Sequence, residues 1–154
     1  MKLFHISDLH IGKILHEVNL LEEQKIVLAQ VLALADLHKP DGILIAGDIY
    51  DKAVPSAEAV KVFDTFLSEL ADRGLSVFLI SGNHDSSERI HFASRILQKE
   101  NIFIKGIFDG KLEPVELKAD GQKVLVYLLP YIRPFDVRPY YPEEEIDSYD
   151  RAVR

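Results

Sequence analysis

Three short polar segments of this chain each follow a run of apolar residues, and each contains side chains that bind metal ions. They are Asp8-Leu9-His10, Gly47-Asp48-Ile49-Tyr50-Asp51 and Gly82-Asn83-His84-Asp85. The preceding runs, residues 2–7, 42–46 and 76–81, are typical of buried parallel strands. Because an open α/β sheet gathers its chemistry at the carboxyl ends of such strands, the segments are expected to meet at one edge. The pattern predicts a dinuclear metal site.

The segments offer carboxylate, imidazole and amide ligands. Asp8 and His10 lie two residues apart, so on an extended backbone both side chains point to one side and can bind one cation. Asp48 follows a glycine that permits a sharp turn, and its two oxygens suit it to bridge two ions. Asn83 would offer a neutral oxygen to the second ion. Two ions so placed would stabilise the attacking and leaving oxygens of a phosphoryl transfer, which predicts phosphoester hydrolysis.

Three further residues of these segments are predicted to assist the ligands. His84 is predicted to stabilise or protonate the leaving oxygen, and Asp85 to orient or charge its ring. Asp51 is predicted to hydrogen-bond a ligand or the loop.

Composition limits the classes of protein that the chain can belong to. Its 154 residues, 47% hydrophobic and 28% charged, are ordinary for one soluble globular domain. The absence of cysteine excludes disulfides, zinc-thiolate sites and thiol catalysis. No apolar run approaches the length of a membrane helix and the chain starts with a strand instead of a leader, so a cytoplasmic protein without a membrane partner is expected. The net charge of -7 argues against a broad basic surface for nucleic acid, although bound cations would offset part of it.

The remaining pattern predicts an α/β fold with the order β-α-β-α-β-α-β, followed by an antiparallel hairpin. Helices are expected over residues 19–39, from Ser56 to Gly74, and over 87–99, with a fourth strand at 102–105. Asn19 and Glu22 are predicted to form a capping box. The pair Asp120-Gly121 predicts a tight turn between strands at 114–118 and 123–129. Residues 130–142 contain four prolines and are expected to form an extended surface loop, and residues 143–154 a helix that has only begun, as in a chain that is cut short.

Apolar residues at helical spacing predict the buried faces of the first two helices. The predicted faces are Leu20, Val27, Val31, Leu34 and Ala35 in the first, and Val60, Phe63, Leu67 and Leu70 in the second. Phe66 or Val62 would then be exposed and could mark a subunit contact. His5, inside the first strand, is expected to be a hydrogen-bonded core histidine.

The motifs D-x-H, G-D-x-x-D and G-N-H-D, in this order after successive strands, resemble the calcineurin-like metallophosphoesterase superfamily, whose fold is a layered α/β/β/α sandwich. Within it, residues 1–13, 82–89 and 129–131 resemble bacterial nuclease subunits of double-strand-break repair. These are manganese-dependent nucleases, exonucleolytic on double-stranded DNA and endonucleolytic on single-stranded or hairpin DNA, that act with an SMC-like coiled-coil ATPase in repair and recombination.

The resemblance implies roles for particular residues and partners for the chain. It places Asp8 and His10 on the first metal, Asp48 between the metals, Asn83 on the second, and His84 as acid or transition-state stabiliser. It implies two divalent ions, manganese with magnesium as the alternative. It also implies DNA, the ATPase subunit and a second copy of the chain as partners.

The chain departs from the superfamily pattern in its later part. The pattern includes one further histidine and a G-H-x-H motif, and no histidine follows His91. Residues 1–154 therefore resemble the N-terminal portion of the nuclease domain. The hypothesis that follows is that this chain alone binds at most one divalent metal well and is weakly active or inactive.

Some choices stay open from the sequence. The candidates for DNA contact are His16, Arg89, Arg133 and Arg138. Each has a structural alternative: a solvated loop histidine, an arginine paired with Asp85, or a proline-rich loop packed on its own domain. Besides a nuclease, a phosphatase or cyclic-nucleotide phosphodiesterase of the same superfamily, or a non-catalytic module that binds the ATPase or a twin subunit, would suit the chain.

Overall fold

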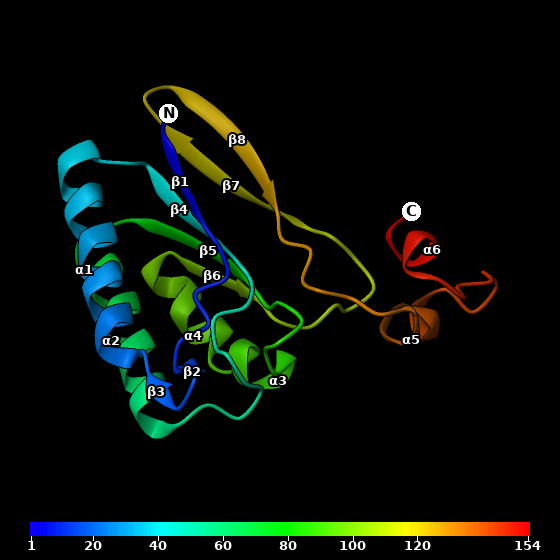
Figure 1. Ribbon diagram of the computed structural model, residues 1–154. Coiled ribbons are helices and arrows are strands. Elements are labelled where there is room, and N and C mark those ends of the chain that lie inside the picture. The colour runs from blue at the N-terminus through cyan, green and yellow to red at the C-terminus, as the bar shows by residue number, and fades with distance from the viewer.

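A parallel sheet lies at the centre of the computed structural model, which describes residues 1–154 (Figure 1). Its four strands have the spatial order β1 (Leu3–Ile6), β4 (Gly42–Ala46), β5 (Ser76–Ile80) and β6 (Ile102–Lys105). Leu3 lies opposite Gly42, Gly42 opposite Ser76, and Val77 opposite Ile102, and all three pairings are parallel. The predicted α/β fold is confirmed, and the ends of β1, β4 and β5 that precede the three motifs share one edge.

Two long helices, α1 (Leu21–His38) and α2 (Ala57–Asp72), cover one face of this sheet (Figure 1). The main core lies between them and the strands. Its buried residues include Leu28, Phe63, Phe66 and Leu70 from the helices and Ile43, Ile45, Val77 and Leu79 from the strands. Ser56 caps α2 as predicted, since its hydroxyl accepts a hydrogen bond from the Ala59 backbone N–H at 3.2 Å.

The helix faces that pack on the sheet agree only in part with the predicted ones: Ala35, Phe63 and Leu70 are buried as predicted, and Val31 and Leu67 are partly buried against the core. In α1 the buried residues are Leu21, Leu28 and Ala35, whereas Val27 and Leu34 are exposed. The helix carries apolar residues all around, so their spacing alone does not single out one face. The predicted capping box is also absent, because Asn19 accepts from the Leu21 N–H at 3.0 Å and no side chain caps the helix.

In α2 the buried stripe is Ala59, Phe63, Phe66 and Leu70. Phe66 is only 2% exposed, so its assignment to a subunit contact is wrong. Val60, predicted to be buried, is 44% exposed. The steps of four, three and four residues in the observed stripe follow the 3.6-residue period and place a small residue, Ala59, beside Gly12.

His5 on β1 is also exposed. The prediction of a core histidine is therefore wrong, because β1 lies at the edge of the sheet.

The predicted third helix is broken into α3 (Ser87–His91), α4 (Ser94–Leu97) and the 3₁₀ turn η1 (Gln98–Glu100). The break lies at Ala93, whose φ of 59° is left-handed. Gly106, just after β6, sits so close to this segment that a Cβ there would lie 2.4 Å from the Ser87 carbonyl oxygen. Its N–H donates to His91 Nδ1 at 3.3 Å, which gives His91 a structural contact.

Two antiparallel hairpins accompany the parallel sheet. The predicted one joins β7 (Pro114–Ala119) to β8 (Gln122–Tyr127), and both turn residues, Asp120 and Gly121, have the positive φ that a tight Asp-Gly turn requires. The other, β2 (Ile14–Leu15) with β3 (Val18–Asn19), lies between the first motif and α1 and was not predicted.

The C-terminal segment forms a second, small core. The loop expected over residues 130–142 instead contains α5 (Pro134–Val137) and the 3₁₀ turn η2 (Arg138–Tyr140), and α6 (Tyr149–Val153) follows. Ile132, Val137 and Ile146 are buried together here. The segment lies apart from α1 and α2 (Figure 1).

None of the helices has the length and apolar character needed to cross a bilayer.

The burial of Phe66 generates a prediction about stability. Replacement of Phe66 by Ala should lower the free energy of unfolding by about 3–5 kcal/mol, because it leaves a cavity between α2 and the sheet. The control residue is Ile26, which is 60% exposed on α1. The substitution Ile26→Ala should change the free energy of unfolding by less than about 0.5 kcal/mol. Urea denaturation followed by circular dichroism measures both, and equal effects would contradict this assignment of the core.

Candidate metal centre

The loops that follow β1 and β4 run side by side at the edge of the sheet. The N–H groups of Asp8, His10 and Ile11 donate to the carbonyls of Gly47, Asp48 and Ile49 at 3.2, 2.9 and 2.9 Å. Asp8, His10 and Asp48 have left-handed φ values of 56°, 43° and 51°. Such a conformation costs a residue other than glycine of the order of 1–3 kcal/mol, so neighbouring contacts must hold it.

The loop after β5 is joined to the second loop by the carboxylate of Asp85. This side chain is 9% exposed and accepts hydrogen bonds from the backbone N–H groups of Ile49, Tyr50 and Gly82 at 3.1, 3.0 and 2.9 Å. Three donors satisfy the buried charge. None of these partners is the His84 ring. The hydrogen bonds of Asp85 join the second and third loops, and its orienting role toward His84 remains a prediction that they do not support.

Gly82 lets the second and third loops approach closely. A Cβ at this position would lie 2.1 Å from Asp48 Oδ1 and 2.3 Å from the Asp48 backbone nitrogen. In the space so provided, Asp48 Oδ1 accepts the His84 backbone N–H at 2.9 Å. One oxygen of Asp48 is thereby fixed by the third loop, and Oδ2 is directed toward the first.

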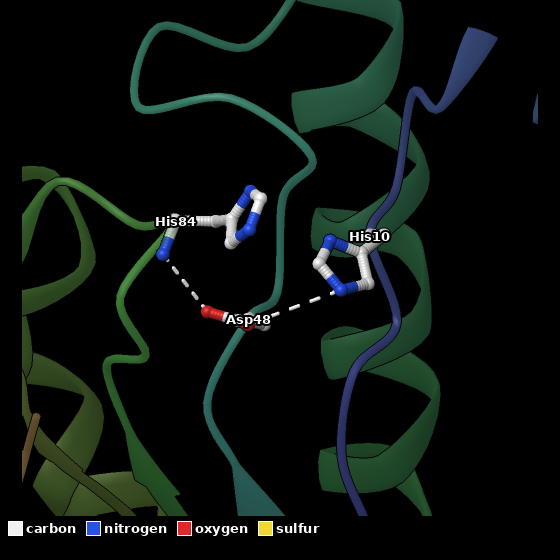
Figure 2. A group of neighbouring side chains, drawn as sticks. All are labelled: His10, Asp48 and His84. Atoms are coloured by element: carbon white, nitrogen blue, oxygen red, sulfur yellow. Dashed lines mark hydrogen bonds and ion pairs between the residues drawn. The ribbon is translucent and has the colours of Figure 1, made fainter.

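The ligand atoms of His10, Asp48 and His84 all lie within 4.8 Å of one another, and the two rings point toward each other across Asp48 (Figure 2). His10 Nε2 is 3.8 Å from both Asp8 Oδ1 and Asp48 Oδ2. Metal–ligand bonds of about 2.0–2.2 Å allow two donor atoms of one ion to lie at most about 4.4 Å apart, and the two 3.8 Å separations are within that limit. The side chains of Asp8 and Asp48 thus both lie beside the His10 ring, and their role as metal ligands remains a prediction.

Asp51 contacts both histidines. Its backbone carbonyl accepts from His84 Nδ1 at 3.1 Å, so the proton is on Nδ1 and the lone pair is on Nε2. Its Oδ1 lies 3.7 Å from His10 Nδ1 and 3.5 Å from Lys13 Nζ. His10 Nδ1 is buried and without a hydrogen-bond partner, and Asp51 is the carboxylate beside it. The predicted supporting role of Asp51 remains a prediction, which these contacts favour.

The other predicted site residues differ in their surroundings. Asn83 is exposed and remains the predicted ligand of a second ion. Arg133 pairs with Asp136 and lies over the Phe135 ring, and Arg138 donates to the Ile146 carbonyl at 2.6 Å. Both arginines thus hold the C-terminal segment together. His16, at the β2–β3 turn, and Arg89, on α3, are exposed.

Two residues near the site were missed by sequence reasoning. Gln24 on α1 hydrogen-bonds the backbone of the first loop, and a single glutamine in a helix carries no signal of such a contact. Tyr50 is buried against Phe63. Burial raises the pKa of Tyr50 to about 12, and the nearby carboxylates of Asp85 and Asp64 add to the effect. Its phenol is therefore neutral and packs as part of the core.

The chain belongs to the calcineurin-like phosphoesterase family, whose model matches residues 1–150. Members of this family use divalent metals, and the His10, Asp48 and His84 group could hold one. The chain is also similar to the SbcD subunit of nuclease SbcCD from Staphylococcus epidermidis. The two are 33% identical over 154 residues, which cover 99% of this chain and 40% of the relative. The chain thus spans less than half the length of this relative.

The buried carboxylate of Asp85 generates a prediction. In Asp85→Asn an amide N–H₂ would face backbone donors, so we expect the free energy of unfolding to fall by about 2–3 kcal/mol. Asp72→Asn, exposed at the end of α2, is the matched control and should stay within about 0.5 kcal/mol of the wild type. Urea denaturation without metal checks both, and an Asp85→Asn protein as stable as the control would refute the role.

Proposed function

We propose that this chain is part of a metal-dependent DNA nuclease that hydrolyses phosphodiesters, and that it supplies the first-metal ligands and the histidine that faces the substrate. The observation that carries the proposal is the convergence of Asp8, His10 and Asp48, with the free Nε2 of His84 beside them. When bound, divalent ions activate water and neutralise charge on a phosphate.

The protein groups have separable tasks in this proposal. Asp8, His10 and Asp48 would hold the first ion, and Asp48 with Asn83 would contribute to a second. His84 donates from Nδ1 to the Asp51 carbonyl and would present Nε2 to the phosphate or to the leaving oxygen; with a second proton on Nε2, the ring would donate to that oxygen and stabilise its developing charge. Asp51 fixes the direction of that ring through its backbone. Manganese, with magnesium as the alternative, is proposed from the resemblance to the nuclease subunits, and the carboxylate and amide oxygens of the donor set suit either ion.

DNA is the proposed substrate because of the 33% identity to the SbcCD nuclease component. His16, at the β2–β3 turn, and Arg89, on α3, are exposed and are the proposed candidates for phosphate contact. A phosphatase or cyclic-nucleotide phosphodiesterase would use the same metal ligands. Hydrolysis of p-nitrophenyl phosphate or cyclic AMP, with DNA left intact, would favour that alternative.

The proposal includes partners and a location. An SMC-like ATPase of the SbcC type and a second copy of the chain are the proposed protein partners, and the cytoplasm is the proposed location. Exposed apolar side chains of Ile26, Leu34 and Leu37 on α1 support a protein contact on that helix, in place of Phe66. Residues 1–154 would form the N-terminal portion of the nuclease domain, and three ligands of the family pattern would then lie outside it.

The ligand set predicts how this chain binds manganese. Calorimetric titration should find one well-bound Mn²⁺ per chain, and Asp48→Asn should weaken it at least tenfold because a charged ligand is lost. The control is Asp64→Asn, on the exposed side of α2, which should bind Mn²⁺ with the affinity of the wild type. Two tight sites in this chain would contradict the single-ion hypothesis, and no Mn²⁺ binding would contradict the metal centre.

His84 generates a further prediction. Under single-turnover conditions with the protein in excess, His84→Ala should slow Mn²⁺-dependent cleavage of an oligonucleotide at least 100-fold, while the Mn²⁺ affinity stays within twofold. His5→Ala, exposed on β1, is the control. A tenfold loss of Mn²⁺ affinity in His84→Ala would make His84 a ligand instead. Binding of a partner protein by the wild type, with Asp8→Ala and His84→Ala changing nothing measurable, would favour the non-catalytic alternative.

A further inference from the structure

We propose that Gln24 is a positioning residue that fixes the backbone around His10 and thereby sets the affinity of the first site for a divalent cation. The proposal rests on the proposed function, in which His10 Nε2 is a ligand. Gln24 lies in the first turns of α1, outside the three motifs, and contacts no predicted ligand side chain.

The side-chain amide of Gln24 spans the first loop. Its Nε2 donates to the carbonyls of Leu9 and His10 at 3.0 and 2.7 Å, and its Oε1 accepts the Gly12 N–H at 2.9 Å. Both amide hydrogens and one oxygen lone pair are therefore engaged. A single side chain satisfies three backbone groups that lie within four residues of the chain.

Gln24 and the second motif hold opposite ends of the His10 backbone unit, its carbonyl and its N–H. The His10 N–H donates to the Asp48 carbonyl, so that side of the backbone is held by the loop after β4. The His10 carbonyl accepts from Gln24 Nε2 at 2.7 Å and from the Lys13 backbone N–H at 3.1 Å, so Gln24 is the side chain that ties this group to α1. Because His10 has a left-handed φ of 43°, relaxation of its backbone toward an ordinary conformation would rotate the Cα–Cβ bond. The ring would then leave its place between Asp8 and Asp48.

The chemistry of the contact requires an amide. A glutamate at position 24 keeps the size of the side chain and the acceptor for Gly12, but it loses both donors and sets a carboxylate against two carbonyl oxygens. A methionine keeps the length and loses all three hydrogen bonds. Gln30 on the same helix is exposed and makes no hydrogen bond through its side chain, so Gln30→Glu adds the same charge without the contact.

The first experiment measures Mn²⁺ affinity by calorimetry in the 154-residue chain, at a temperature where circular dichroism shows every variant to be folded. We expect Gln24→Glu and Gln24→Met to bind Mn²⁺ about tenfold more weakly than the wild type, and Gln30→Glu to stay within twofold. A merely structural clamp would lower the melting temperature and leave the affinity of the folded chain unchanged. Affinities within twofold of the wild type in both Gln24 variants would overturn the proposal.

A second measurement needs no metal. Long-range ¹H–¹⁵N spectra of the histidine rings in the metal-free chain should show shifted His10 resonances in Gln24→Met and unchanged ones in Gln30→Glu. Unchanged His10 resonances in Gln24→Met would also overturn the proposal. Failure of the wild type to bind Mn²⁺ would instead refute the proposed function, and the ring spectra would still test whether Gln24 positions His10.

Discussion

The metal centre depends on the need to hold strained backbone in place at the edge of the parallel sheet. Asp8, His10 and Asp48 all adopt left-handed conformations, which aim their side chains into a common space. Each loop is therefore held by hydrogen bonds to another segment of the chain. The first is bonded to the second through backbone groups, the second to the third through the Asp85 carboxylate, and the first to α1 through Gln24. The ligand geometry is a property of this network more than of any one loop.

The electrostatics of the site follow from the same arrangement. Three carboxylates, from Asp8, Asp48 and Asp51, lie within 4 Å of the His10 ring, and Lys13 is the cation that pairs with one of them. The Asp85 carboxylate, in contrast, is stabilised by three backbone N–H donors. The negative charge of the carboxylates near His10 is thus only partly balanced by Lys13, which favours binding of a divalent cation. The buried carboxylate of Asp85 has a structural role instead.

The sequence was sufficient for the four strands of the parallel sheet and for the meeting of the three motifs at its edge, but not for the short hairpin of β2 and β3. The strands and the motifs were predictable because buried parallel strands and Gly-Asp or Gly-Asn turns leave strong local patterns. The turn at Asp120 and Gly121 was predictable for the same reason. The faces of α1 and α2 were not, since Val27 and Phe66 are both apolar and only packing on the sheet decides which is buried. Similarly, nothing local distinguishes the buried Asp85, or the Gln24 that spans a loop, from residues in solvent.

The contact between His84 and Asp51 is made through the main chain at position 51. Any amino acid placed there retains that carbonyl, so alanine scanning of the chain would register the loss of the carboxylate beside His10 and leave the support of His84 undetected. Evolution has the same freedom: the His84 ring can keep its tautomer while the amino acid at position 51 changes. Only a change in the path of the loop, such as a deletion or a backbone ester, would expose this dependence.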